Sequence, residues 1–147
     1  MKHVLVIFCL LIGITQGCTH KNTDQPVGLH TKVNGKDWGA TTFEANWYRN
    51  PGTISTHFEV VGYGTGGSSL ADTSISLYFT DSLVYEGSYL IGNKAYATFF
   101  FDGINPSFAS SGTVTVTSRS LHNIQGTFNF VADSFTVTDG KFNISIP

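Results

Sequence analysis

The feature that most constrains the fold of this chain is the alternation of apolar and polar residues in its last third, residues 111–147. Val114 and Val116 alternate with threonines, and Phe142 and Ile144 alternate with small polar residues. Alternation with a period of two, carried by β-branched and aromatic residues, is typical of half-buried antiparallel strands. Three successive strands are therefore predicted, at residues 112–117, 124–132 and 134–146.

Shorter runs of the same kind occupy the preceding part of the chain. Further strands are predicted at residues 41–48, 54–63, 74–80, 88–91 and 96–101. Asn34-Gly35 predicts a tight hairpin, because a type I′ turn needs a positive φ at both of its central residues. The glycine- and serine-rich residues 62–72 predict a loop. The run from Phe99 to Phe101 is apolar on both faces, which indicates a strand that is central or covered.

These segments predict an all-β fold, an antiparallel meander of eight to ten strands without a helix of three turns. The two candidate architectures are a β-sandwich and a flattened or closed barrel. The sandwich is favoured because the inward residues are mostly large and would fill the space between two sheets. A barrel that holds a ligand would mix more small residues among them.

The N-terminus predicts export from the cytoplasm. Residues 4–14 form an apolar run of about eleven residues, which is shorter than the roughly 17–25 of a membrane-spanning helix. With Lys2 before it and Gly17 after it, the run is typical of a secretory signal peptide. The following Cys18 resembles the lipidated cysteine of the bacterial lipoprotein lipobox. An ordinary secretory signal with an incidental cysteine is the alternative.

The chain thus divides into a signal peptide (1–17), a lipidated cysteine with a polar tether (18–28) and one all-β domain (29–147). The chain has two cysteines, Cys9 within the signal and Cys18, so no disulfide framework is available to the domain. About 130 mature residues suffice for one stable core. We expect an outer-membrane lipoprotein that faces the periplasm, attached to the membrane through Cys18.

Several motifs extend over most of the mature chain: NGKDW at 34–38, GSY at 87–89, SGTVTVTS, IQGTFNF and VTDGKFNISI. With the signal peptide and Cys18, they resemble a family of small lipoproteins of Bacteroidota that is described as a domain of unknown function. The resemblance implies the all-β fold and the envelope address. It implies no catalytic or ligand-binding residue.

Residue patterns for catalysis, metal binding and nucleic-acid binding are weak. Gly62, Gly64 and Gly67 match a dinucleotide-binding motif, but a strand-like segment follows where that motif requires a helix. The histidines lack the spacing of a zinc site, and the basic residues form no cluster that could bind phosphates. We expect no metal, no cofactor and no enzymatic activity. A hydrolase built from remote residues, such as His57 or His122 with Asp102, is the least favoured alternative.

Aromatic residues carry the remaining functional hypothesis. Trp38 and Trp47 are predicted to lie in the core, whereas Tyr48, Tyr63 and Tyr85 are predicted to be exposed and to bind a ligand. The favoured function is therefore a non-catalytic binding or accessory module for a protein or a glycan. The main alternative is a lipocalin-like carrier, which would need an apolar cavity inside a closed barrel.

Overall fold

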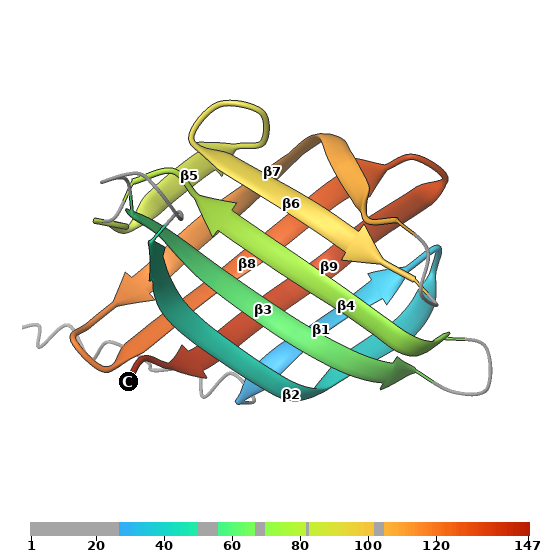
Figure 1. Ribbon diagram of the computed structural model, residues 1–147, viewed down its shortest axis with the longest axis horizontal. Coiled ribbons are helices and arrows are strands. Elements are labelled where there is room, and N and C mark those ends of the chain that lie inside the picture. The colour runs from blue at the N-terminus through green and yellow to red at the C-terminus, as the bar shows by residue number, and fades with distance from the viewer. Residues whose placement is uncertain (1–26, 50–55, 67–69, 82, 102–104) are drawn as a thin grey trace, which may run out of the picture.

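The computed structural model describes residues 27–49, 56–66, 70–81, 83–101 and 105–147 (Figure 1). The predicted signal peptide and Cys18 lie outside the described residues. The described part is all-β and antiparallel, with these strands: β1 (Gly28–Val33), β2 (Lys36–Arg49), β3 (Thr56–Gly66), β4 (Leu70–Phe79), β5 (Gly87–Leu90), β6 (Ala95–Phe100), β7 (Ser107–Arg119), β8 (Asn123–Ala132) and β9 (Phe135–Ser145).

Eight of these strands close into a barrel. Each of β1, β2, β3, β4, β6, β7, β8 and β9 pairs with the next in this series, and β9 pairs with β1. The short β5 pairs with β7 on the same edge as β6, beyond the place where β6 begins. In Figure 1, strands β2, β3, β4 and β6 cross in front of β7, β8, β9 and β1. The meander was predicted correctly, but the preference for a sandwich was wrong.

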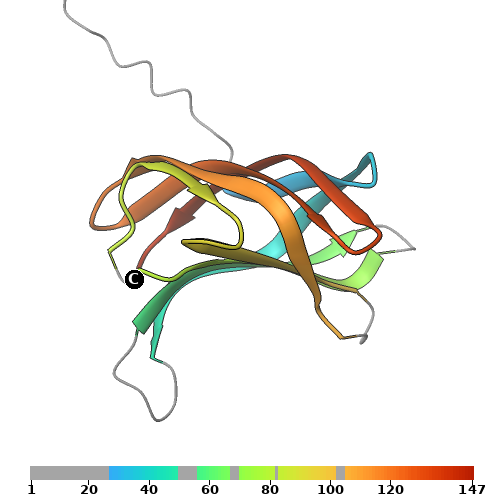
Figure 2. The same ribbon diagram turned by 90° about the horizontal axis from the view of Figure 1, so that it is seen from above.

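Strand β7 shows how the two layers become one closed sheet. Its register shifts between Ala109 and Ser111 and again between Val116 and Ser118. Such bulges bend a strand and increase its twist. Figure 2 shows β7 (orange) bending from the upper layer toward the lower one. The predicted strand at 112–117 is therefore only the middle of a longer one, since Ser107–Arg119 belongs to β7.

Small residues inside the barrel explain why the sandwich prediction failed. Gly62 and Gly64 continue the inward positions of Phe58 and Val60 on β3. A Cβ on Gly64 would lie 2.6 Å from the Trp38 ring, so the glycine makes room for the indole. Residues 62–66 therefore belong to β3, and the loop predicted from them was wrong there. Glycine here permits close packing in the barrel interior.

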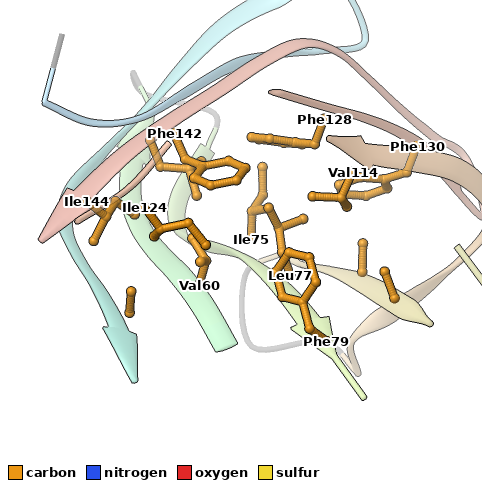
Figure 3. Close-up of a cluster of buried hydrophobic side chains, with 14 of the residues drawn as sticks. Val60, Ile75, Leu77, Phe79, Val114, Ile124, Phe128, Phe130, Phe142 and Ile144 are labelled. Carbon is orange, nitrogen blue, oxygen red and sulfur yellow. The ribbon is translucent and has the colours of Figure 1, made fainter. Parts of the chain in front are cut away.

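The interior is filled by side chains. An eight-stranded barrel is just wide enough for its own inward residues. Phe58, Phe79, Phe99 and Phe142 are each 0 or 1 % exposed. Figure 3 shows side chains from β3 and β4 converging with those from β7, β8 and β9. The Trp38 prediction is confirmed, with 2 % exposure, and its indole N–H donates to the Thr73 hydroxyl at 2.6 Å.

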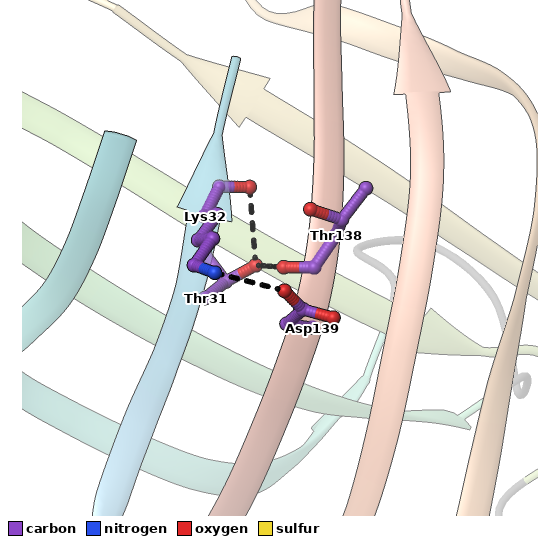
Figure 4. Close-up of polar contacts among 4 residues, drawn as sticks. All are labelled: Thr31, Lys32, Thr138 and Asp139. Carbon is purple, nitrogen blue, oxygen red and sulfur yellow. Dashed lines mark hydrogen bonds and ion pairs between the residues drawn. The ribbon is translucent and has the colours of Figure 1, made fainter. Parts of the chain in front are cut away.

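The seam between β1 and β9 closes the ring. The register between β1 and β9 shifts between His30 and Lys32, so Thr31 has no direct partner on β9. Its hydroxyl donates instead to the carbonyl oxygen of Thr138 at 2.7 Å and lies 3.5 Å from the carbonyl oxygen of Lys32 (Figure 4). Lys32 Nζ lies 3.3 Å from Asp139 Oδ2 across the same seam. A side-chain hydrogen bond thus joins the two strands where their register shifts.

Local turn chemistry follows the sequence closely. Asn34 and Gly35 have φ values of 50° and 78°, which confirms the predicted hairpin between β1 and β2.

Phe99 lies on β6, which pairs with β4 on one side and β7 on the other, so the predicted central position is confirmed. Within the described ranges, no helix is long and apolar enough to span a membrane.

Candidate functional site

Exposed aromatic side chains gather on the outside of the barrel, across β2, β3, β4, β6 and β7. We call this surface the aromatic face and define it by five residues: Tyr48, His57, Tyr78, Tyr96 and Phe108. Strand alternation places His57, Tyr78 and Tyr96 there, because their chain neighbours Phe58, Phe79, Ala95 and Ala97 point into the core. Phe58 and Phe79 are buried beside His57 and Tyr78, and Ala95 and Ala97 are buried on either side of Tyr96.

Sheet register brings these residues together. Tyr48 is paired with His57, and their rings stack with centroids 5.7 Å apart and planes 22° apart. The His57 ring lies 5.9 Å from that of Tyr78, which is paired with Tyr96. Phe108 continues the row opposite Thr98. Because strands lie about 4.8 Å apart, a row across five strands is about 19 Å long.

A hollow of about 530 Å³ lies within the aromatic face. Phe108 is 68 % exposed and Tyr96 is 45 % exposed, so both rings are available to a ligand. The described lining contains no Asp, Glu, Lys or Arg. It consists of these residues: Thr56, His57, Tyr78, Phe79, Thr80, Tyr96, Thr98 and Phe108. Apolar walls with a few hydroxyl and imidazole groups are typical of small-molecule and sugar sites.

Acidic side chains lie next to the aromatic face on β2 and β3. The Glu44 carboxylate accepts hydrogen bonds from Asn46 Nδ2 at 3.0 Å and from the Tyr48 hydroxyl at 3.1 Å. Glu59 is paired with Tyr78 on the neighbouring strand. The hydrogen bond to Glu44 orients the Tyr48 ring. The two carboxylates also place negative charge beside the aromatic face, which disfavours an anionic ligand.

Two tyrosines near these carboxylates, Tyr48 and Tyr63, have a raised pKa. Partial burial raises the pKa of the Tyr48 phenol, the hydrogen bond with Asn46 lowers it, and Glu44 raises it further. Burial, followed by the charges of Glu44 and Glu59, raises the pKa of Tyr63. Both hydroxyl groups therefore stay protonated throughout the physiological pH range. The Tyr48 hydroxyl already donates to Glu44, so it can only accept from a ligand.

The three tyrosines predicted to bind a ligand do not form one site. Tyr48 belongs to the aromatic face. Tyr63 is 50 % exposed on β3, but six residues from His57, so about 20 Å along the strand. Tyr85 is 65 % exposed and lies between β4 and β5 at the end of the barrel. Trp47, predicted to be core, is 44 % exposed and packs edge-on against Phe58.

Four residues of the aromatic face were missed by the sequence prediction: His57, Tyr78, Tyr96 and Phe108. The alternation already placed His57 and Tyr78 on the outward side of predicted strands. What the sequence did not provide was the register that sets Tyr78 beside Tyr96. Phe108 lay outside every predicted strand, because residues 107–111 are mostly small and polar.

Residues with catalytic or metal-binding chemistry are dispersed in the described part of the chain. No group of three His, Cys, Asp or Glu side chains converges there as a metal site. His122 lies in the turn between β7 and β8, where its backbone N–H donates to the Ser120 hydroxyl at 3.3 Å. Asp102, a candidate of the hydrolase alternative, falls outside the described residues, as does Cys18.

Protein-family models, curated proteins and solved structures were each compared with the chain, and none of the three comparisons found a match.

Proposed function

We propose that this protein is a non-catalytic binding module of the cell envelope whose aromatic face binds an uncharged glycan. The observation that carries the proposal is an open hollow lined by the rings of His57, Tyr78, Tyr96 and Phe108. The Tyr48 ring extends this row by stacking on His57. Sugar rings have apolar faces that stack on aromatic side chains, and their hydroxyl groups pair with hydroxyl and imidazole groups. The face offers both kinds of group.

The charge distribution favours an uncharged ligand. The described lining of the hollow lacks charged carboxylate, ammonium and guanidinium groups. Glu59 is paired with Tyr78 of the lining, and Glu44 bonds Tyr48 at one end of the aromatic face. An acidic polysaccharide or a nucleic acid would meet negative charge there without a cation to pair with it. An uncharged oligosaccharide meets no such repulsion. The length of the row, about 19 Å, accommodates several sugar rings.

Truncation of the exposed rings is the direct test. We expect Phe108→Ala and Tyr96→Ala each to weaken binding of an uncharged oligosaccharide by about tenfold or more, because exposed aromatic anchors dominate such interfaces. The measurement is isothermal titration calorimetry with cellohexaose, maltohexaose and xylohexaose, and with oligogalacturonate as the acidic comparison.

The matched control is Tyr63→Ala, which removes an exposed ring from β3 outside the hollow and should leave the affinity unchanged. Equal losses in all three variants would contradict the assignment of the aromatic face. So would tighter binding of oligogalacturonate than of the uncharged sugars, or no binding of any uncharged sugar.

Location in the cell envelope is part of the same proposal. A lipidated Cys18 would hold the domain at the outer membrane, facing the periplasm, through the polar tether that ends at β1. Several acyl chains are needed for stable attachment, since one chain gives only marginal binding.

We expect Cys18→Ala to move the protein from the membrane fraction to the soluble fraction, because the substitution removes the thiol that carries the lipid. Cell fractionation followed by immunoblotting measures this. Cys9→Ala is the matched control, since Cys9 lies within the predicted signal peptide and should not affect attachment. Unchanged membrane association of Cys18→Ala would reject this anchor.

A lipocalin-like carrier is the second candidate, and the closed eight-stranded barrel is the observation in its favour. Such carriers hold a small apolar ligand inside the barrel. Here Phe58, Phe99 and Phe142, all 0 % exposed, occupy the interior together with the other core residues. A carrier function would require these side chains to move apart, so the outer surface is the better candidate.

A further inference from the structure

The end of the barrel where β7 finishes holds a cation in a fixed position. The Arg119 guanidinium carbon lies 5.5 Å from the centroid of the Trp47 ring and 5.6 Å from that of Phe58. These two rings are themselves packed edge-on, with centroids 5.0 Å apart. A guanidinium over aromatic faces is attracted by their electron density. Arg119 is therefore anchored by packing and does not move freely in solvent.

The hydrogen-bonding capacity of Arg119 is largely unused. Its Nε is buried and has no hydrogen-bond partner, and no described residue accepts from its terminal N–H groups. Burial lowers the pKa of the guanidinium from its ordinary value, since the charge has lost part of its hydration. A partly dehydrated cation without an acceptor is costly to bury. An anion at the terminal N–H groups would add hydrogen bonds to the charged guanidinium and compensate for part of its lost hydration.

An apolar hollow of about 660 Å³ opens beside this cation. Leu83 and Tyr85 are each 65 % exposed, and Leu121 is 84 % exposed, although all three line the hollow. Large apolar side chains that gather in the open around a concave surface mark an interaction site. The site therefore combines one cation with an apolar surface.

The wall that carries Leu83 and Tyr85 is held in place. The Tyr89 hydroxyl donates to the Tyr85 carbonyl oxygen at 2.7 Å and accepts from the Tyr85 backbone N–H at 3.0 Å. Val84, between Leu83 and Tyr85, points into the core and is 5 % exposed. Both contacts fix the backbone of this segment. The hollow is thus formed before a ligand arrives, which reduces the entropic cost of binding.

One acidic residue shares the hollow. Glu86 lies on its rim, and its carboxylate accepts from the backbone N–H of Arg119 at 3.3 Å. No ion pair joins Glu86 to the guanidinium in the described part of the chain. Glu86 therefore leaves the terminal N–H groups of Arg119 available, while its charge opposes the approach of an anion.

We propose that this end of the barrel binds a small amphipathic carboxylate, with the carboxylate on Arg119 and the apolar chain against Leu83, Tyr85 and Leu121. The planar fork of a guanidinium matches two carboxylate oxygens, which makes arginine the best side chain for this contact. The site is separate from the aromatic face and does not depend on the glycan proposal. A fatty acid and the C-terminus of an apolar peptide both have this chemistry.

The first test compares ligands that differ only in their head group. Sodium octanoate should bind, whereas 1-octanol and octylamine should bind at least about tenfold more weakly, because neither carries the negatively charged acceptor that forms strong charge-assisted hydrogen bonds with the guanidinium. The arginine Nε–H signals in a ¹H–¹⁵N spectrum report the contact, since the chain contains two arginines, Arg49 and Arg119. Octanoate should shift the signal that disappears in Arg119→Lys.

The second test uses three variants of the protein. Arg119→Lys keeps the charge but loses the fork, so octanoate binding should weaken about tenfold. Glu86→Gln should strengthen it, because the opposing charge is removed. Leu121→Ser should weaken it without affecting the fold, since this side chain is 84 % exposed. N-acetyl-leucyl-leucine, used in parallel, distinguishes a peptide C-terminus from an acyl chain by which ligand binds more tightly.

Equal affinities for octanoate and octanol would overturn the proposal, as would an unshifted Arg119 signal at saturating octanoate. Octanoate binding that is unchanged or weaker in Glu86→Gln would overturn it too. If Arg119→Lys fails to fold, the opposite effects of Glu86→Gln and Leu121→Ser decide the matter, because both positions lie at the exposed rim.

Discussion

Phe142→Ala is expected to lower the free energy of unfolding by about 3–5 kcal/mol, the range measured for large aromatic residues removed from protein cores. Phe142 is 0 % exposed, and its ring centroid lies 6.4 Å from that of Phe128. It belongs to β9, which pairs with both β1 and β8. The cavity would therefore lie next to the seam that closes the barrel, where neighbouring strands cannot collapse independently.

Urea unfolding followed by circular dichroism measures this loss. Phe108→Ala is the matched control, because it removes the same atoms from a side chain that is 68 % exposed. Its effect on stability should stay within about 0.5 kcal/mol, as for ordinary surface substitutions. A similar loss of stability in both variants would contradict the difference in burial between Phe142 and Phe108.

Gly126→Ala is expected to destabilise the protein by about 1–3 kcal/mol or more, although it adds a single methyl group. The new Cβ would collide with the Phe142 ring and with the carbonyl oxygen of Thr115. The second of these atoms belongs to the backbone of β7 and cannot rotate away. Relief would require β7 and β8 to separate at this point.

Gly39→Ala provides the comparison for this substitution. A Cβ there would meet only the exposed His30 side chain, at 3.1 Å, and that side chain can move. We expect a change within about 0.5 kcal/mol in the same unfolding experiment. If Gly126→Ala proves as harmless as Gly39→Ala, the inward position of Gly126 on β8 would be wrong.

Local patterns made most strands predictable. Alternating residues defined β8 and β9, and Asn34-Gly35 defined the first hairpin, because both depend on neighbours in the sequence. The barrel was not predictable in this way. Gly62 and Gly64 lie in a glycine-rich segment that is typical of a loop. Their close packing against Ala40 and Trp38 explains why they belong to a strand instead. That packing depends on how β2 and β3 pair.

The candidate site was predictable only in part, for a related reason. Tyr48 was identified by its outward position in a single strand. Tyr78 and Tyr96 become a site only when β4 and β6 lie side by side in a given register. The guanidinium of Arg119, on β7, contacts the ring of Trp47, on β2, although the two residues are far apart in the sequence. Sequence alternation indicates which way a side chain points, but not what it meets.

The seam between β1 and β9 also governs when the barrel can form. The hydrogen bond from Thr31 to Thr138 joins residues that are 107 positions apart. During synthesis, the edge of β1 that pairs with β9 therefore stays unpaired until β9 has been made. Pairings so distant in sequence slow folding, and open strand edges invite association with other chains. Pairing of β9 with both β1 and β8 is thus the step that closes the barrel. It removes the open strand edges that could associate with other chains.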